Sequence, residues 1–259
     1  MTYGDVMINQ IFNEDCLIGM QRIPDGSIDM VLVDPPFGST NCQWDKRIPF
    51  EPLWAQYKRI CKKNAAIVIF SQLPFSAELI MSNLKMFRYE WVWEKNLGTG
   101  FLNINRMPMR CHENILVFYQ MLPVYNPQFN EGETYKRTCK DYIGGVYRPR
   151  KRSYTNINNG KRYPRDVIKF KSTIGQLKER FHSTQKPVDL LEYLIKTYTN
   201  EGETVLDNCI GSGSTSVACV NTNRKFIGFE TEMKYCEIAR RRIEEAQKNK
   251  QSAEVGLLF

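Results

Sequence analysis

The chain has 259 residues, 42% of them hydrophobic, which suits one large domain with a substantial core. Its 36 Lys and Arg against 28 Asp and Glu give a net charge of +8, and 134–186 alone carries 15 basic and 3 acidic residues, so this excess predicts a polyanionic partner. Eight scattered cysteines without a C-x-x-C pair, no secretory signal and no apolar run longer than six residues predict a cytoplasmic protein with reduced thiols and no membrane contact.

Strands and helices alternate along the first half of the chain. Two apolar stretches at 6–12 and 28–33 predict strands, and Leu17, Met20 and Ile23 between them have the spacing of a short helix. The pattern continues with a helix at about 50–62, a strand at 66–70, a helix at about 74–84 and strands at 89–96 and 113–119. Such alternation predicts an open, parallel-type α/β sheet.

This alternation disappears between 122 and 181. Tyrosines are interleaved there with Lys and Arg, and isolated prolines and an Asn-rich turn interrupt any periodicity. The segment therefore predicts an inserted recognition region outside the sheet. The alternation resumes with a helix near 188–198, a strand at 204–207, a helix from about 214, a strand at 225–230 and a charged helix near 232–248.

The predicted strand at 28–33 ends in Asp34, Pro35, Pro36 and Phe37. Two successive prolines cannot donate to a sheet ladder, and Pro36 biases Pro35 toward an extended conformation, so the strand ends here with unpaired carbonyl groups. A carboxylate and an aromatic ring thus directly follow a buried strand. The stretch is either an ordinary strand terminator or a site.

A second turn, "VLDNCIGSGSTSVACV", joins a predicted strand to a helix through Gly211 and Gly213. Glycines allow a sharp turn and a close approach to a ligand, and the helix start offers unpaired N–H groups. The turn is neither G-x-G-x-x-G nor a P-loop with its lysine. Glu230 ends the next strand, 19 residues beyond Gly211, a spacing that suits an acidic side chain accepting hydrogen bonds from ribose hydroxyls. The alternative is a routine strand–helix turn with an incidental glutamate.

Together, DPPF and "DNCIGSGST" resemble the amino-methylating DNA methyltransferases that use S-adenosylmethionine, in the circularly permuted β arrangement. The catalytic tetrapeptide of that arrangement lies near the N-terminus and the cofactor loop near the C-terminus. "RCHENILVFY" resembles the family's R-x-H-E strand, and "HSTQKP" at 182–187 resembles its H-P-T-Q-K-P segment. Two departures are Phe37, where Tyr is commoner, and Asn208-Cys209, where Pro-Phe is usual. Neither removes a required polar group.

The resemblance implies a Rossmann-like α/β sheet with helices on both faces and a single domain over 1–259, with 122–181 as an inserted target-recognition region. It implies a base flipped out of double-stranded DNA, with the Asp34 carboxylate and the Pro35 carbonyl accepting hydrogen bonds from the target amine and Phe37 stacking on the base. For S-adenosylmethionine it implies contacts from Asp15, Cys16, His182, Thr184, Lys186, Asp207, Gly211, Ser212, Gly213 and Glu230. The basic insertion supplies the expected DNA contacts: Arg148, Arg150, Lys151, Arg152, Lys161 and Arg162.

Some roles stay open. Lys186 as a solvated surface charge and His182 as a packing residue at a helix start are alternatives to cofactor contacts. Within the resemblance, Asp at the first motif position favours adenine N6, and the same-chemistry alternative is cytosine N4. Alternatives of other kinds are an RNA or protein amide methyltransferase and a non-enzymatic DNA-binding module.

Other chemistries lack their residues. Carbon-5 cytosine methylation needs a nucleophilic cysteine, typically after a proline, and none of the eight cysteines follows one. His112 and His182 are the only histidines, no G-x-S-x-G occurs, and no zinc-ligand spacing is present, so we expect neither a serine hydrolase nor a metal site.

The chain ends in three large apolar residues, Leu257, Leu258 and Phe259. Because such side chains are costly to leave in water, we expect them to dock. One hypothesis is docking on the protein's own sheet or on a second subunit of a homodimer. The other is recruitment, because the tail partly resembles the Leu-Phe-ending peptides that bind bacterial sliding clamps.

Overall fold

The structure is a computed structural model that describes residues 7–40, 42, 45–139, 154–173 and 185–256. It divides into two compact units. The larger unit comprises 1–126 and 166–259, and the smaller comprises 127–165. The apolar tail at 257–259 lies outside the described residues, so both hypotheses for it stay predictions.

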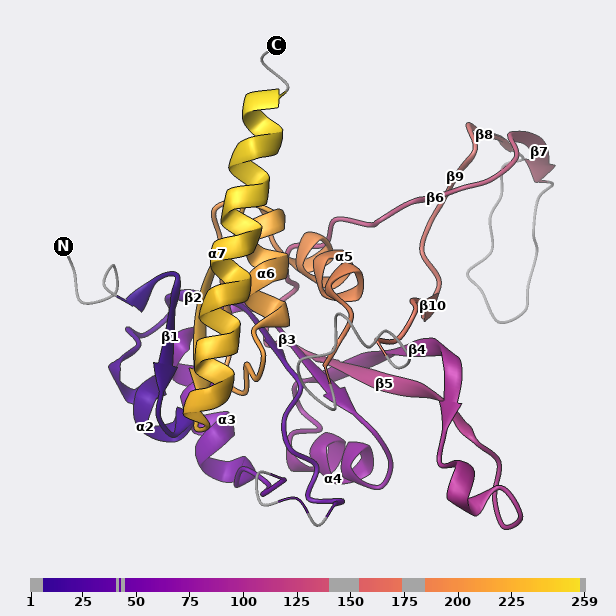
Figure 1. Cartoon of the computed structure of the whole chain (residues 1–259). Coiled ribbons are helices and arrows are strands. Elements are labelled where there is room, and N and C mark those ends of the chain that lie inside the picture. The colour runs from indigo at the N-terminus through magenta and orange to yellow at the C-terminus, as the bar shows by residue number, and fades with distance from the viewer. Residues whose placement is uncertain (1–6, 41, 43–44, 140–153, 174–184, 257–259) are drawn as a thin grey trace. The chain divides into compact units, whose positions relative to one another are not determined.

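An eight-stranded sheet forms the centre of the larger unit (Figure 1). Its strands, in spatial order, are β1 (Gln10–Asn13), β12 (Lys225–Glu230), β11 (Thr204–Asp207), β2 (Ile28–Val33), β3 (Cys61–Ser71), β5 (Arg110–Phe118), β4 (Phe87–Thr99) and β10 (Val167–Lys169). All six residues of β2 are buried, as expected for a strand covered on both faces.

Helices cover both faces of the sheet, which confirms the predicted Rossmann-like class (Figure 1). One face packs against α2 (Cys16–Gly19), η1 (Met20–Arg22), α3 (Phe50–Ile60) and α4 (Phe75–Ser82). The other packs against α5 (Val188–Tyr198), α6 (Ser214–Asn221) and α7 (Met233–Gly256). Apolar residues at helical spacing provide these contacts; in α3 they are Leu53, Trp54, Tyr57 and Ile60.

Two expectations about the sheet were wrong. The sheet is mixed rather than parallel, because β5 runs antiparallel to both β3 and β4. A hairpin joins β4 to β5, and a connection of that kind can only pair antiparallel strands. The region at 122–181 is also not entirely outside the sheet, since β10 pairs with β4.

The smaller unit holds two two-stranded sheets. One pairs β6 (Asn130–Glu131) with β9 (Lys161–Arg162), and the other pairs β7 (Tyr135–Cys139) with β8 (Tyr154–Asn158). The unit is shorter than the predicted insertion of 122–181, because the chain returns to the main sheet at Asp166. Its role in target recognition stays a prediction.

The parallel strands β2, β11 and β12 end at a common edge of the sheet. Leu206 of β11 is level with Val31 of β2, and Asp207 is level with Gly228 of β12. The residues at or directly after these strand ends are therefore neighbours. Among the residues that the structure describes, no helix combines the length and apolarity that crossing a bilayer needs.

Candidate active site

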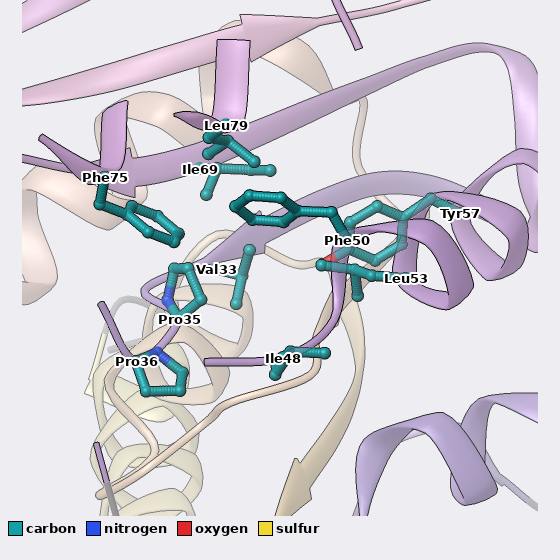
Figure 2. A pocket seen from close by; sticks show the side chains of 10 residues that line it. All are labelled: Val33, Pro35, Pro36, Ile48, Phe50, Leu53, Tyr57, Ile69, Phe75 and Leu79. Atoms are coloured by element: carbon teal, nitrogen blue, oxygen red, sulfur yellow. The ribbon is translucent and has the colours of Figure 1, made fainter. Parts of the chain in front are cut away.

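The two prolines of DPPF anchor the turn after β2 on the core. Pro35 is buried, and the rings of Pro35 and Pro36 line a small apolar pocket with Val33 of β2, Phe50 of α3 and Leu79 of α4 (Figure 2). The cavity measures about 10 Å³, room for about one water molecule. It is therefore a packing feature that fixes the turn and is too small to hold a base.

Asp34 belongs to a chain of four charged groups, of which Lys186 is buried and the other three are partly buried. Lys186 Nζ donates to Asp34 Oδ2 at 2.5 Å and lies 3.3 Å from Glu113 Oε2. Glu113 Oε1 accepts from Lys95, whose side chain is only 6% exposed. Because Glu113 Oε2 has no aligned hydrogen-bond donor, its contact with Lys186 is ionic. Two carboxylates and two ammonium groups alternate, so the group as a whole is neutral.

Burial and neighbouring charges shift the pKa values of Asp34, Lys186 and Glu113 in different directions. Burial raises the pKa of Asp34, which the ammonium of Lys186 only partly offsets. Burial opposes the charged form of Lys186, but the carboxylates of Asp34 and Glu113 outweigh it and raise the pKa of the lysine. Burial likewise acts against ionised Glu113, yet Lys186 and Lys95 lower its pKa. Lys186 is thus a firmly charged partner for Asp34.

Phe37 and the loop after it are fixed by local contacts. The Phe37 ring stacks on Phe75 of α4, with centroids 5.0 Å apart and an interplanar angle of 26°. Arg47 Nε donates to the Phe37 carbonyl at 2.6 Å. The Asp45 carboxylate accepts from the backbone N–H groups of residues 38–40 at 2.7–2.8 Å. The ring is therefore held in place before any ligand arrives.

The loop after β11 is organised by two carboxylates. Asp207 Oδ1 accepts from the Cys209 N–H at 3.0 Å, and Asp207 Oδ2 accepts from Thr215 Oγ1 at 2.6 Å. Glu230 Oε2, at the end of β12, accepts from the Gly211 N–H at 2.9 Å. These bonds join the loop to both strand ends and to the first turn of α6.

The two glycines of the loop have different reasons to be glycine. Both adopt positive φ, +52° at Gly211 and +81° at Gly213, which favours glycine at each. A Cβ on Gly213 would lie 2.6 Å from the Ala239 Cβ of α7, so this glycine permits close helix packing. A Cβ on Gly211 would meet no atom within 4 Å, so open space adjoins this position.

Acidic groups are crowded where β2, β11 and β12 end. Burial raises the pKa of Asp207 to about 7, and the charges of Asp34 and Glu230 act in the same direction. Burial also raises the pKa of Glu230. Within the part of the chain that the structure describes, neither Asp207 nor Glu230 forms an ion pair. A cationic ligand beside the glycine loop would relieve this repulsion.

The remaining residues predicted to bind the cofactor lie near this loop with structural partners of their own. Asp15 caps α2 by accepting from the Leu17 N–H at 2.8 Å, and its side chain is exposed. Cys16 is buried, and its Sγ lies 3.6 Å from the Asn208 amide nitrogen. Ser212 is buried in the loop, where its Oγ donates to Gln185 at 3.3 Å.

Several predicted site residues lie outside the described residues: His182, Thr184, Arg148, Arg150, Lys151 and Arg152. Lys161 and Arg162 are described and belong to the smaller unit. The Arg162 guanidinium lies over the Tyr135 ring and donates to Asn158 and Glu133, so it holds this unit together. The exposed Lys161 lies over Phe129.

No site role was predicted for Lys95, Glu113 or Arg242, although Glu113 is the glutamate of the R-x-H-E segment. Lys95 and Glu113 continue the buried side of alternating strands, after Trp93 in β4 and before Ile115 in β5. A charge on the inward face of such a strand was a readable signal. Arg242 of α7 donates to the Ser212 carbonyl at 2.6 Å and stabilises the glycine loop from below. Its position in a charged helix gave no such signal.

Comparisons with known proteins identify DNA methyltransferases as relatives of this chain. The type II methyltransferases M.HpaI of Haemophilus parainfluenzae and M1.MboII of Moraxella bovis are 26% and 28% identical to this chain, over 92% and 88% of it and 75% and 94% of their own length. The DNA adenine methyltransferase YhdJ of Escherichia coli K12 is 26% identical over 91% of this chain and 83% of its own.

Solved structures resemble the chain as well. The M1.HpyAVI complex with S-adenosylmethionine has a TM-score of 0.62 and 26% identity, covering 90% of this chain and 98% of that one. The cytosine-N4-specific PvuII methyltransferase reaches the same TM-score at 14% identity, over 90% of this chain and 85% of its own, a likeness of fold alone. Residues 28–241 match the sequence profile of the DNA methylase family N6_N4_Mtase, and the chain therefore belongs to this family.

Proposed function

We propose that this DNA methylase binds S-adenosylmethionine and transfers its methyl group to N6 of an adenine flipped out of double-stranded DNA. The observation that carries the proposal is the position of Asp34 and Pro35 at the strand edge that also holds Asp207 and Glu230. The relative YhdJ, a DNA adenine methyltransferase, and the M1.HpyAVI complex with S-adenosylmethionine support the choice of base and cofactor.

The target amine needs help because its lone pair is delocalised into the ring. The Asp34 carboxylate and the Pro35 carbonyl accept hydrogen bonds from its two N–H groups, which favours a tetrahedral nitrogen as positive charge develops. Phe37 offers a flat face on which the flipped base stacks. The base must leave the duplex for this contact, at a cost of a few kcal/mol.

The cofactor fits the acidic end of the site. S-adenosylmethionine carries an ammonium and a sulfonium group, and the crowded carboxylates of Asp207 and Glu230 favour a cation beside the glycine loop. Glu230 would accept hydrogen bonds from the ribose hydroxyls of the cofactor, and Asp15 would lie near the adenine ring of the cofactor. The open space beside Gly211 lets the ligand approach the backbone. When bound, the cofactor supplies an electrophilic methyl group.

Lys186 has a different role in this mechanism from the one the motif implied. It was predicted to contact the cofactor, and that contact stays a prediction; in the structure its ammonium group donates a hydrogen bond to Asp34. Because burial raises the pKa of Asp34, an adjacent cation is needed to keep the carboxylate ionised as a hydrogen-bond acceptor. Lys186 is thus a positioning residue, held in turn by Glu113, which Lys95 neutralises.

A product analysis tests the function. Purified protein, unmethylated DNA and methyl-labelled S-adenosylmethionine are incubated, and the digested nucleosides are separated by mass spectrometry. We expect N6-methyladenine from the wild type and none from Asp34→Ala, while calorimetry shows cofactor binding by both. N4-methylcytosine would overturn the choice of base, and DNA binding without any methylated product would indicate a non-enzymatic module. Loss of cofactor binding in Asp34→Ala would contradict the separation of the two halves of the site.

A further inference from the structure

The β4–β5 hairpin extends beyond the edge of the sheet where Asp34 lies. β3 ends at Ser71, level with Asn114 of β5, whereas the pairing of β4 with β5 continues to Thr99 and Arg110. At about 3.3 Å per residue, the strands carry the turn at 100–109 roughly 15 Å past Asn114. Figure 1 shows this hairpin projecting from the same side of the larger unit as the segment that follows β2.

Large apolar side chains cover the tip of this hairpin. Leu102 is 84% exposed and Phe101 is 68% exposed. Ile104, Met107 and Met109 are exposed as well. Single exposed apolar residues are ordinary on protein surfaces, but five within nine residues at a hairpin tip indicate a contact surface.

Backbone hydrogen bonds order the turn that carries these side chains. Gly100 has a φ of +89°, and its carbonyl accepts from the Asn103 N–H at 3.0 Å in a single turn of 3-10 helix, η2 (Phe101–Asn103). The Asn103 carbonyl then accepts from the N–H groups of Arg106 and Met107 at 2.8 and 3.0 Å. Ordering before binding lowers the entropic cost of inserting the side chains into a partner.

The charge of the hairpin end narrows the choice of partner. Arg106 and Arg110 are the only charged residues between 97 and 112, so apolar side chains are accompanied there by positive charge alone. Two copies of such a tip would repel each other. The tip is also too small for a stable dimer, which needs about 20–30 residues from each partner. A polyanion with an apolar interior, namely duplex DNA, matches both properties.

We propose that the hairpin tip enters the DNA duplex beside the flipped nucleotide, with Leu102 and Phe101 packing against the bases at the gap and Arg106 and Arg110 contacting phosphates. This inference rests on the proposed function, because flipping opens the gap. Apolar wedges of this kind offset part of the cost of unstacking a base step. The hairpin then stabilises the open duplex while Asp34 holds the extruded base.

The test compares Leu102→Ala with Leu84→Ala. Leu84 is 60% exposed, but it precedes β4, whose first residue pairs with the last residue of β5 at the edge of the sheet opposite the hairpin tip, and it is therefore a matched control. Binding is measured by fluorescence anisotropy on a labelled duplex containing the methylated site found in the product analysis. Flipping is measured with 2-aminopurine in place of the target adenine. We expect Leu102→Ala to bind about tenfold more weakly and to give a reduced 2-aminopurine signal, while Leu84→Ala matches the wild type.

A mismatch at the target pair separates wedge insertion from simple contact. A mismatched base leaves the stack at lower cost, so the binding defect of Leu102→Ala should shrink on that duplex. Wild-type binding and flipping by Leu102→Ala, or a defect of unchanged size on the mismatch, would overturn the wedge. A change in oligomeric state on analytical ultracentrifugation would assign the tip to a second copy instead.

The outcomes also separate this inference from the proposed function. Binding is a difference between two variants and needs no methyl transfer. If the wild type binds DNA but yields no methylated base, the proposed function fails, and comparing the two variants on an unspecific duplex still decides whether the tip contacts DNA. If the wild type methylates and the variants do not differ, only the inference about the hairpin fails.

Discussion

Asp207 makes the stability of the ligand-free protein sensitive to pH near neutrality. Burial raises the pKa of this carboxyl from 3.8 to about 7, a difference of about three units that corresponds to about 4 kcal/mol. The folded state retains the proton that the unfolded state releases, so this stabilising contribution is complete below pH 3.8 and is lost as the pH rises through about 7. Between pH 5 and pH 8 the loss is about 3 kcal/mol.

Urea unfolding of the wild type and of Asp207→Asn at pH 5 and pH 8 measures this loss. Asn cannot titrate, so we expect the wild type to lose about 3 kcal/mol more than the variant over this range. Asp34 and Glu230 also have raised pKa values and add to the decline in both proteins. The difference between the two proteins therefore isolates Asp207. Equal declines would refute the assignment of a shifted pKa to this residue.

Cofactor binding should remove the proton from Asp207, because a nearby cation favours the carboxylate. We expect calorimetry near pH 7, in two buffers of different ionisation enthalpy, to show proton release when S-adenosylmethionine binds, and affinity to rise through pH 7. Thr215→Val removes the hydroxyl that donates to Asp207 Oδ2, so the release should shift to higher pH, and Thr215→Ser should keep the wild-type profile. Binding without proton release at any pH would show that the cation lies elsewhere.

Two further predictions concern the catalytic half of the site. Lys186→Met should move the acidic limb of the single-turnover pH profile to higher pH and slow transfer at neutral pH by at least about tenfold, because Asp34 loses the cation that favours its ionised form. Glu113→Gln should shift the acidic limb less, and unchanged profiles in both variants would exclude a positioning role for Lys186. Phe37→Tyr should remain active, whereas Phe37→Ala should lose about 1–3 kcal/mol of DNA binding, and equal affinities of the Ala variant and the wild type would make the ring purely structural.

Local patterns in the sequence were sufficient for most of the fold. The spacing of Leu53, Trp54 and Tyr57 predicted α3, and the apolar run at 28–33 predicted a strand that is fully buried. The direction of β5 was not predictable in this way, because antiparallel and parallel strands can carry similar runs of apolar residues. Only the hairpin connection between β4 and β5 determines the direction of β5. Both strands are longer in the structure than the sequence predicted.

The parts of the site that follow from strand ends were also predictable. Asp34, Asp207 and Glu230 each end or directly follow a predicted strand, and parallel strands bring their ends to one edge. The contact between Lys186 and Asp34 was not predictable, since these residues are 152 positions apart and neither belongs to a regular element. A motif indicates which residue types belong to a site, but it does not indicate which carboxylate a long, flexible lysine side chain contacts.

The charge distribution supports the proposal that two unlike ligands bind at adjoining positions. On the proposed side of the base, the charges of Asp34, Glu113, Lys186 and Lys95 sum to zero, so a neutral ring would meet no net charge while the ionised Asp34 carboxylate remains available as an acceptor. On the side of the glycine loop, Asp207 and Glu230 have no basic partner among the described residues and carry a negative charge that rises with pH. A cation is favoured there and not beside Asp34, whose charge Lys186 already balances. The same separation predicts that Lys186→Met should strengthen the attraction of the catalytic half for cations only at a pH high enough to ionise Asp34, which then has no cation beside it.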